Sequence, residues 1–252
     1  AADKTITYGD YAPAYEIESI TGFVTAYGDT AANSIPTPTL SCSYSQFWNA
    51  NADSNGDLLS GATAYVIVPS VASSTNYDYT FENGDLFVKK AILTVTANDN
   101  ELVYGDAPAN DGVVFTGFKG FDTETSIGYT GTVSYSYLDS TDTVINKFAP
   151  AYTDGTAAGT QIEYKIVVDV TALEADNYEF TAVDGKLTFK KYKLEDGQTT
   201  ANGSATLNLI YGDATPAYSV SGLIFPAGAP ETVATLGLEF DGQYEPKNGV
   251  GP

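Results

Sequence analysis

The sequence predicts a mainly β protein built from tandem small domains, and three observations lead to that prediction. The tripeptide Tyr-Gly-Asp recurs with its tyrosine at Tyr8, Tyr104 and Tyr211, and such self-similarity is the mark of a repeat architecture. Residues 76–90 align without gaps on residues 177–191, at a constant offset of 101 residues. Between these markers apolar and polar residues alternate with the period of two that is typical of half-buried strands.

Each unit is expected to begin with a turn at Tyr-Gly-Asp. The glycine allows a backbone conformation that other residues resist, and the aspartate can cap the exposed amides of the turn. A second turn follows downstream in all three copies, at residues 21–23, 116–118 and 221–223. In the first two copies this turn is followed by Asp-Thr, at Asp29 and Asp122.

Further strands and one short helix are expected inside the units. Cys42 lies in a short stretch where apolar residues alternate with serines, which predicts a strand with Cys42 as a small core residue. The alternation within residues 64–68, 128–138 and 161–170 predicts three more strands. Residues 172–176 are the one candidate for a turn or two of helix.

The closing segment of each unit is predicted to form a hairpin. In the first copy aromatic residues alternate over residues 77–81, Asn83-Gly84 supplies a tight turn, and Leu86 begins the returning strand. In the second copy the same turn is expected at residues 184–185.

The joins between units are predicted to be short and stiff, giving tandem domains in an elongated arrangement. Leu93, Val95 and Ala97 continue the period of two directly into the second unit, and no Gly/Ser linker separates the two. The second join, over residues 192–203, is more polar and is expected to bend more. The third copy ends at Pro252, before any counterpart of the closing segment. The predicted units are residues 1–90, 91–191 and a partial third at 192–252.

Composition excludes several classes of function. The chain has 11 Lys, no Arg and 32 Asp plus Glu, a formal net charge of −21, which argues against nucleic acid as a partner. It also has no His and one Cys, so no Ser-His-Asp or Cys-His arrangement and no His-ligated zinc site can form. No apolar run reaches the length of a membrane span. An acidic surface instead keeps a secreted protein soluble.

These motifs together resemble the MBG repeats of bacterial adhesins, of the Tyr-Gly-x type. The resemblance rests on Lys-x-x-Leu-Thr-Val-Thr-Ala, on Tyr-Gly-Asp with a following proline, on the Gly-Phe turn and on the closing Asn-Tyr-x-Phe-Thr segment. It implies a β-grasp-like core, a place at the bacterial cell surface or in the secreted fraction, and an adhesive or stalk role. It implies no catalytic residue. The insert at residues 49–59 departs from the usual pattern and leaves room for a local specialisation.

Two binding hypotheses concern this insert. Phe47 and Trp48, the one tryptophan, could stack on a sugar face, which makes them candidate ligand-binding residues of a carbohydrate-binding module. Asp53, Asn55 and Asp57 place oxygen side chains at alternate positions, as a calcium loop does, but the usual glutamate at the twelfth position is missing. A plain polar loop is the competing interpretation for these three residues.

The sequence therefore predicts a non-enzymatic extracellular repeat segment, acting as an adhesin or stalk. The alternatives are a carbohydrate-binding module and a calcium-stabilised spacer; no other cofactor is expected. The expected partner is a protein or glycan on a host or neighbouring cell, with no membrane insertion of this segment, and the chain is expected to be monomeric.

Overall fold

The computed structural model describes residues 1–153, 159–192, 200–202, 219–221 and 227–230. The chain forms two compact units: the first contains Ala1–Asn98, Asn110–Ser136 and Ile166–Gly185, and the second contains Asp99–Ala109, Tyr137–Lys165 and the chain from Lys186 onwards. The first unit thus combines the whole first sequence repeat with part of the second. The repeat boundaries, the elongated arrangement and the β-grasp-like core stay predictions.

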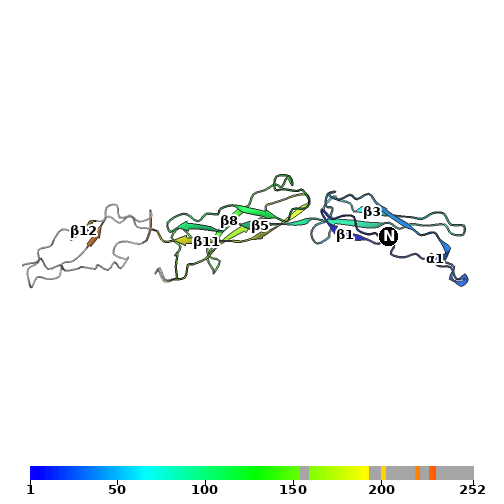
Figure 1. The fold of residues 1–252 in the computed structure, drawn as a ribbon, viewed down its shortest axis with the longest axis horizontal. Coiled ribbons are helices and arrows are strands. Elements are labelled where there is room, and N and C mark those ends of the chain that lie inside the picture. The colour runs from blue at the N-terminus through cyan, green and yellow to red at the C-terminus, as the bar shows by residue number, and fades with distance from the viewer. Residues whose placement is uncertain (154–158, 193–199, 203–218, 222–226, 231–252) are drawn as a thin grey trace, which may run out of the picture. The chain divides into compact units, whose positions relative to one another are not determined.

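Strands dominate the described residues and helix is almost absent, which confirms the mainly β prediction (Figure 1). The strands are β1 (Lys4–Thr7), β2 (Thr39–Cys42), β3 (Tyr65–Ser70), β4 (Gly84–Lys89), β5 (Ala91–Ala97), β6 (Asn100–Val103), β7 (Val113–Thr116), β8 (Ser134–Leu138), β9 (Tyr164–Asp169), β10 (Tyr178–Val183), β11 (Gly185–Lys190), β12 (Thr200–Asn202) and β13 (Ser219–Ser221). The helical elements are the 3-10 turn η1 (Thr25–Tyr27) and the single-turn helix α1 (Ala31–Ser34). No helix in the described ranges has the length and apolar character needed to cross a membrane.

The first repeat forms a four-stranded sheet in the order β1-β4-β3-β2. β1 runs parallel to β4, while β3 is antiparallel to both β4 and β2. Ile67, Leu86 and Val88 alternate with more exposed neighbours and are fully buried, as the period of two predicts. Asn51 is also buried; its side-chain oxygen accepts from the Val88 amide at 2.7 Å, so the insert completes this part of β4.

The second repeat rebuilds the same sheet in the order β6-β11-β9-β8. The register is equivalent, because Lys4 pairs with Leu86 in the first sheet and Asn100 pairs with Leu187 in the second. β9 buries Tyr164, Ile166 and Val168 on one face, which confirms the strand predicted over residues 161–170. The repeat read from the sequence is therefore a repeat of topology as well.

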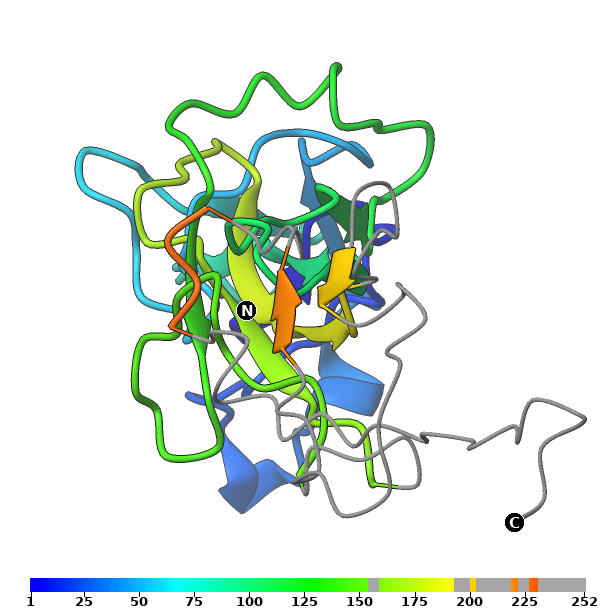
Figure 2. The same ribbon diagram turned by 90° about the vertical axis from the view of Figure 1, so that its left-hand side faces the viewer.

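Another sheet, of three strands in the order β10-β5-β7, has β5 at its centre. β5 runs parallel to β10 and antiparallel to β7. Its residues Ala91, Leu93 and Val95 are completely buried, so the segment that joins the repeats is core and not linker. In the third repeat β12 and β13 pair antiparallel and lie side by side in the turned view (Figure 2). Most of the remainder of that repeat, including Tyr211, lies outside the described residues, as does most of the second join.

The hairpin predicted for the closing segment is wrong. Residues 77–82 form no strand, and in the second repeat β10 and β11 belong to different sheets. Gly84 and Gly185 do not have positive φ and each begins a strand. Their glycine is needed for close packing instead, since a Cβ at Gly84 would lie 2.7 Å from the Ala2 carbonyl oxygen and one at Gly185 would lie 2.8 Å from the Ala97 carbonyl oxygen.

Two smaller predictions also fail. Residues 172–176 form a turn instead of a helix, because Glu174 exchanges two backbone hydrogen bonds with Thr130 and Leu173 is buried. The strand predicted over residues 128–138 is limited to β8. Gly131, with φ of +89°, breaks its first half, and a Cβ there would clash with the Ala172 carbonyl oxygen. Tertiary contacts override local propensity at both places.

Candidate functional site at the junction between the repeats

The Tyr-Gly-Asp motif forms the predicted turn at the end of the strand that precedes it. Gly9 has φ of +88°, and the Asp10 carboxylate accepts from the Thr7 amide at 3.0 Å. The second copy repeats both features, with φ of +101° at Gly105 and an Asp106–Val103 hydrogen bond of 3.1 Å. These observations confirm the turn and its aspartate cap in the two described copies.

The tyrosine of the first motif packs against the second repeat. Tyr8 and Tyr178 are only 5% and 2% exposed, and their rings meet edge to face at 5.5 Å. Both hydroxyls donate to the same carboxylate oxygen, Asp122 Oδ2, at 3.1 Å from Tyr8 and 2.6 Å from Tyr178. The Tyr178 hydroxyl in turn accepts from the Lys119 amide at 2.9 Å. Side chains from three separated parts of the sequence therefore meet at one aspartate.

Close backbone approach makes this contact possible. A Cβ at Gly9 would lie 2.7 Å from Lys119 Cβ, so the glycine of the motif serves the contact as well as the turn. Lys119 Nζ also lies 3.9 Å from Asp10 Oδ1, an exposed ion pair that contributes little to stability. We define the junction cluster as Tyr8, Lys119, Asp122 and Tyr178.

Both tyrosines of the junction cluster are held in their neutral form. Burial, followed by the hydrogen bond to Asp122, raises the pKa of Tyr8 from 10.0 to about 12. The same two causes, burial first, raise the pKa of Tyr178 further. No proton-transfer role near neutral pH follows from such values, whereas a fixed hydrogen-bonding role does.

The first repeat carries a second version of the same arrangement. Tyr77 donates to Asp29 and accepts from the Val24 amide at 3.1 Å, and the Phe23 ring meets Tyr77 edge to face at 5.6 Å. Tyr77 and Asp29 are the first-repeat counterparts of Tyr178 and Asp122. The hydrogen bond to Asp29 raises the pKa of Tyr77. Here, however, no second tyrosine among the described residues donates to the aspartate, and Tyr77 remains partly exposed.

The tyrosine–aspartate pairing was missed at the level of the sequence, although its signals were present. The closing segments align Tyr77 with Tyr178, and Asp-Thr follows the Gly-Phe turn in both copies. What hid the pairing is that the two residues lie about 50 positions apart, 48 in one repeat and 56 in the other. Asp29 also belongs to a further Tyr-Gly-Asp, at residues 27–29, that does not begin a repeat.

The insert at residues 49–59 is a second part of the junction. The Ala50 amide donates to Asn177 Oδ1 at 2.8 Å, and the Ser54 amide donates to Glu179 Oε1 at 2.9 Å. Lys90 Nζ adds a 2.7 Å hydrogen bond to the Ala175 carbonyl oxygen. The departure from the repeat pattern thus has a structural role, because it bonds the first repeat to the second.

The two candidate ligand-binding aromatics take different positions. Phe47, with φ of +68°, packs its ring against Gly120 and meets the Tyr8 ring at 6.1 Å, so it borders the junction cluster. Trp48 lies against Tyr65, with ring centroids 5.7 Å apart, and is 44% exposed. Phe47 is 38% exposed, so both residues keep part of their surface open, and a sugar-binding role for either residue stays a prediction.

The candidate calcium residues form a tight polar loop. Asp53 Oδ1 accepts from the amides of Asn55, Gly56 and Asp57 at 2.8–2.9 Å. These hydrogen bonds, that from Asp57 being the largest cause, lower the pKa of Asp53. In the described part of the chain no group of three or more His, Cys, Asp or Glu side chains is placed to hold a metal ion. The loop geometry fits a self-capped turn, and calcium binding stays a prediction.

Comparison with known proteins bears on the second repeat. Residues 93–188 match the family described as MBG domain (YGX type). The matched range begins within β5 and ends within β11, and it contains Asp122 and Tyr178. No curated protein and no solved structure matches the chain. The family resemblance inferred from the motifs is thereby confirmed.

Proposed function

Because residues 93–188 are an MBG domain of the YGX type, we propose that the chain is a non-enzymatic repeat segment of a bacterial surface protein, acting as a stalk or adhesin region. Domains of this family occur in cell-surface proteins and are a structural, non-catalytic type. The net charge of −21 and the absence of His support an extracellular, non-enzymatic role.

One observation carries the proposal: the repeats are joined through buried contacts. The strand that leaves the first repeat, β5, becomes the central strand of the next sheet after the single residue Lys90. The junction cluster and the insert then bond the repeats at two further places. A segment that must transmit force or hold a fixed spacing needs such coupling, whereas domains on flexible linkers would lack it.

Force spectroscopy on the full chain tests the stalk role. We expect the first repeat and the part of the second repeat in its compact unit to unfold in one event, since β4 continues into β5 through the single residue Lys90 and the junction cluster bonds the two repeats. Separate low-force events for the two would contradict the proposal. Labelling of intact source cells with antibodies to this chain tests location, and labelling that appears only after permeabilisation would contradict a surface position.

A second candidate function rests on Trp48. Trp48 is 44% exposed and directly precedes the polar insert in the chain, and exposed aromatic side chains can stack on a sugar. Titration with glycans under observation of tryptophan fluorescence separates the two functions, because Trp48 is the one tryptophan of the chain. Saturable quenching that Trp48→Phe removes favours a carbohydrate-binding module; unchanged emission across a glycan panel leaves the stalk role alone.

A further inference from the structure

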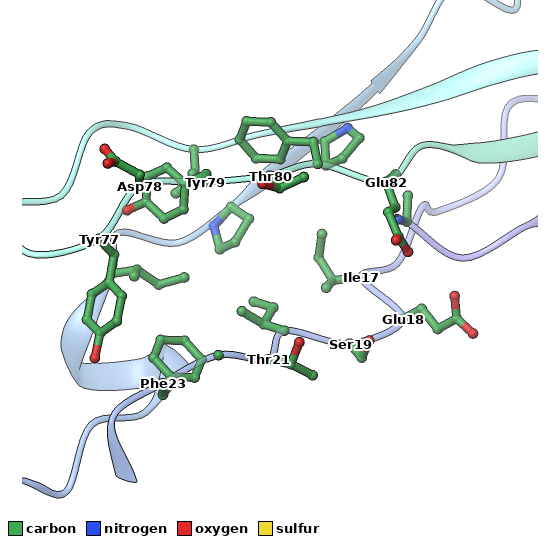
Figure 3. A pocket seen from close by; sticks show the side chains of 18 residues that line it. Ile17, Glu18, Ser19, Thr21, Phe23, Tyr77, Asp78, Tyr79, Thr80 and Glu82 are labelled. Atoms are coloured by element: carbon green, nitrogen blue, oxygen red, sulfur yellow. Dashed lines mark hydrogen bonds between the residues drawn. The ribbon is translucent and has the colours of Figure 1, made fainter. Parts of the chain in front are cut away.

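The first repeat has an open groove where the second repeat has a strand. In the second repeat β5 lies between β10 and β7. Residues 77–82 are the first-repeat counterparts of β10, by the offset of 101, and residues 17–21 are those of β7. Neither segment is a strand, and a groove of about 440 Å³ lies between them. Figure 3 shows side chains of the two segments on opposite sides of this groove.

Equivalent hydrogen bonds fix the correspondence between the repeats. The Asp85 amide donates to Asp3 Oδ1 at 2.8 Å, as the Lys186 amide donates to Asp99 Oδ1 at 2.7 Å. The Tyr8 amide donates to the Lys89 carbonyl oxygen at 2.8 Å, and in the second repeat the Tyr104 amide donates in the same way to the Lys190 carbonyl oxygen. Asp3 is therefore equivalent to Asp99, which makes Ala1 the counterpart of Ala97, the last residue of β5.

Ala1 lies at one end of the groove in the position that this correspondence requires. Its amino nitrogen donates to the Glu82 carbonyl oxygen at 2.7 Å. The next residue, Ala2, donates its amide to the Glu16 carbonyl oxygen at 3.0 Å, as Asn98 does to Gly112. Ala1 and Ala2, which stand where a central strand would end, are thus already hydrogen-bonded to the chain on both sides of the groove.

The lining of the groove suits a strand with apolar residues at alternate positions. Ile20 and Phe81 line it and are 38% and 48% exposed, large values for such residues beside a sheet. Tyr79 also lines it, and its hydroxyl is buried without a hydrogen-bond partner in the described structure. Glu18 and Glu82 make the rim acidic, which favours a basic residue at the entry of the strand.

We propose that this groove is an acceptor site for one β-strand of the β5 type, covalently continuous with Ala1. The strand runs parallel to residues 77–82 and antiparallel to residues 17–21, and it places small or branched apolar side chains in the groove at alternate positions. Main-chain hydrogen bonds to both neighbours supply affinity, and the alternate side chains supply specificity, as in strand addition generally. The site goes beyond the proposed stalk role and does not depend on it.

The test extends the full chain by a copy of residues 90–96 placed directly before Ala1, so that Ala1 takes the place of Ala97. The matched control has the same extension with aspartate in place of the copies of Leu93 and Val95. We expect amide hydrogen exchange over residues 17–21 and 77–82 to slow on the order of tenfold or more in the extended chain, and in neither the control nor the parent chain. Exchange at Ile67, in the sheet of the first repeat, should be unchanged in all three and serves as the folding control.

Three results would overturn the proposal. Equal exchange in the extended chain and the control would show that the groove does not select an apolar strand. Protection by a free peptide of the same seven residues that equals or exceeds that of the fused copy would assign the site to a strand from another molecule. Protection that appears only together with dimerisation, seen by light scattering, would assign it to a second copy of the chain. None of these results alters the force-spectroscopy outcome that tests the stalk role.

Discussion

Removing the carboxylate of Asp122 should weaken the structure far more than removing its counterpart Asp29. In Asp122→Ala the buried Tyr8 hydroxyl loses its carboxylate partner, while Tyr178 keeps the Lys119 amide. Hydrogen bonds to a charged group contribute about 1.5–3 kcal/mol each, so the loss of two predicts a destabilisation of about 3–6 kcal/mol. In Asp29→Ala the partly exposed Tyr77 can turn to water, and the loss should be smaller.

Urea denaturation of the full chain, followed by Trp48 fluorescence, measures both losses. Trp48 is a suitable reporter because it lies in the same compact unit as both aspartates. A double-mutant cycle with Tyr8→Phe isolates the Tyr8–Asp122 contact, for which we expect a coupling of about 1–2 kcal/mol. If Asp122→Ala cost no more than Asp29→Ala, or if the cycle gave no coupling, the junction cluster would not hold the repeats together.

Three further outcomes are expected. The free energy of unfolding should fall as the pH rises from about 10 to about 12, and Tyr8 should account for roughly 2–3 kcal/mol of the fall, because its raised pKa keeps the hydroxyl neutral in the folded protein while it ionises in the unfolded chain. Tyr8→Phe should lessen this fall. Identical pH profiles of stability for the two proteins would contradict the assignment. Gly185→Ala should cost about 1–3 kcal/mol in urea denaturation, since its Cβ would lie 2.8 Å from the Ala97 carbonyl oxygen; a negligible cost would mean that the backbone there relaxes easily. Millimolar calcium should leave the thermal transition unchanged, because three amides already occupy Asp53 Oδ1, and a rise in Tm that Asp53→Asn removes would show a metal site.

Periodicity was a reliable guide to the strands because burial on one face of a sheet imposes it directly. The residues that alternate in β5 and β9 are the ones that the structure buries. Local dipeptide signals were less reliable. Asn83-Gly84 has the composition of a tight turn, yet Gly84 is there because the carbonyl oxygens of Ala1 and Ala2 pack where its Cβ would stand. A close approach between distant segments and a tight turn can both require glycine, so the sequence alone does not distinguish them.

The candidate site was only partly accessible for a related reason. The Gly9 turn and its Asp10 cap depend on neighbouring residues, and the sequence predicts them correctly. The Asp122 contacts depend on residues 56 and 114 positions away, which no local pattern encodes. The alignment of the copies does contain the information, since a shared tyrosine and a shared aspartate recur in the first two repeats. Pairing such shared polar residues is a reasonable hypothesis wherever a repeat has been found.

The position of β5 connects the repeat, the junction and the open groove. β5 follows β4, the closing strand of the first repeat, after the single residue Lys90, and it lies at the centre of the β10-β5-β7 sheet, so the two repeats are joined directly from strand to strand. Unfolding β5 would expose Leu93 and Val95, both fully buried, and would separate β10 from β7. Coupling between repeats is then a property of the topology, and the junction cluster strengthens it. In the first repeat the described structure has a groove at the corresponding place, between residues 17–21 and 77–82.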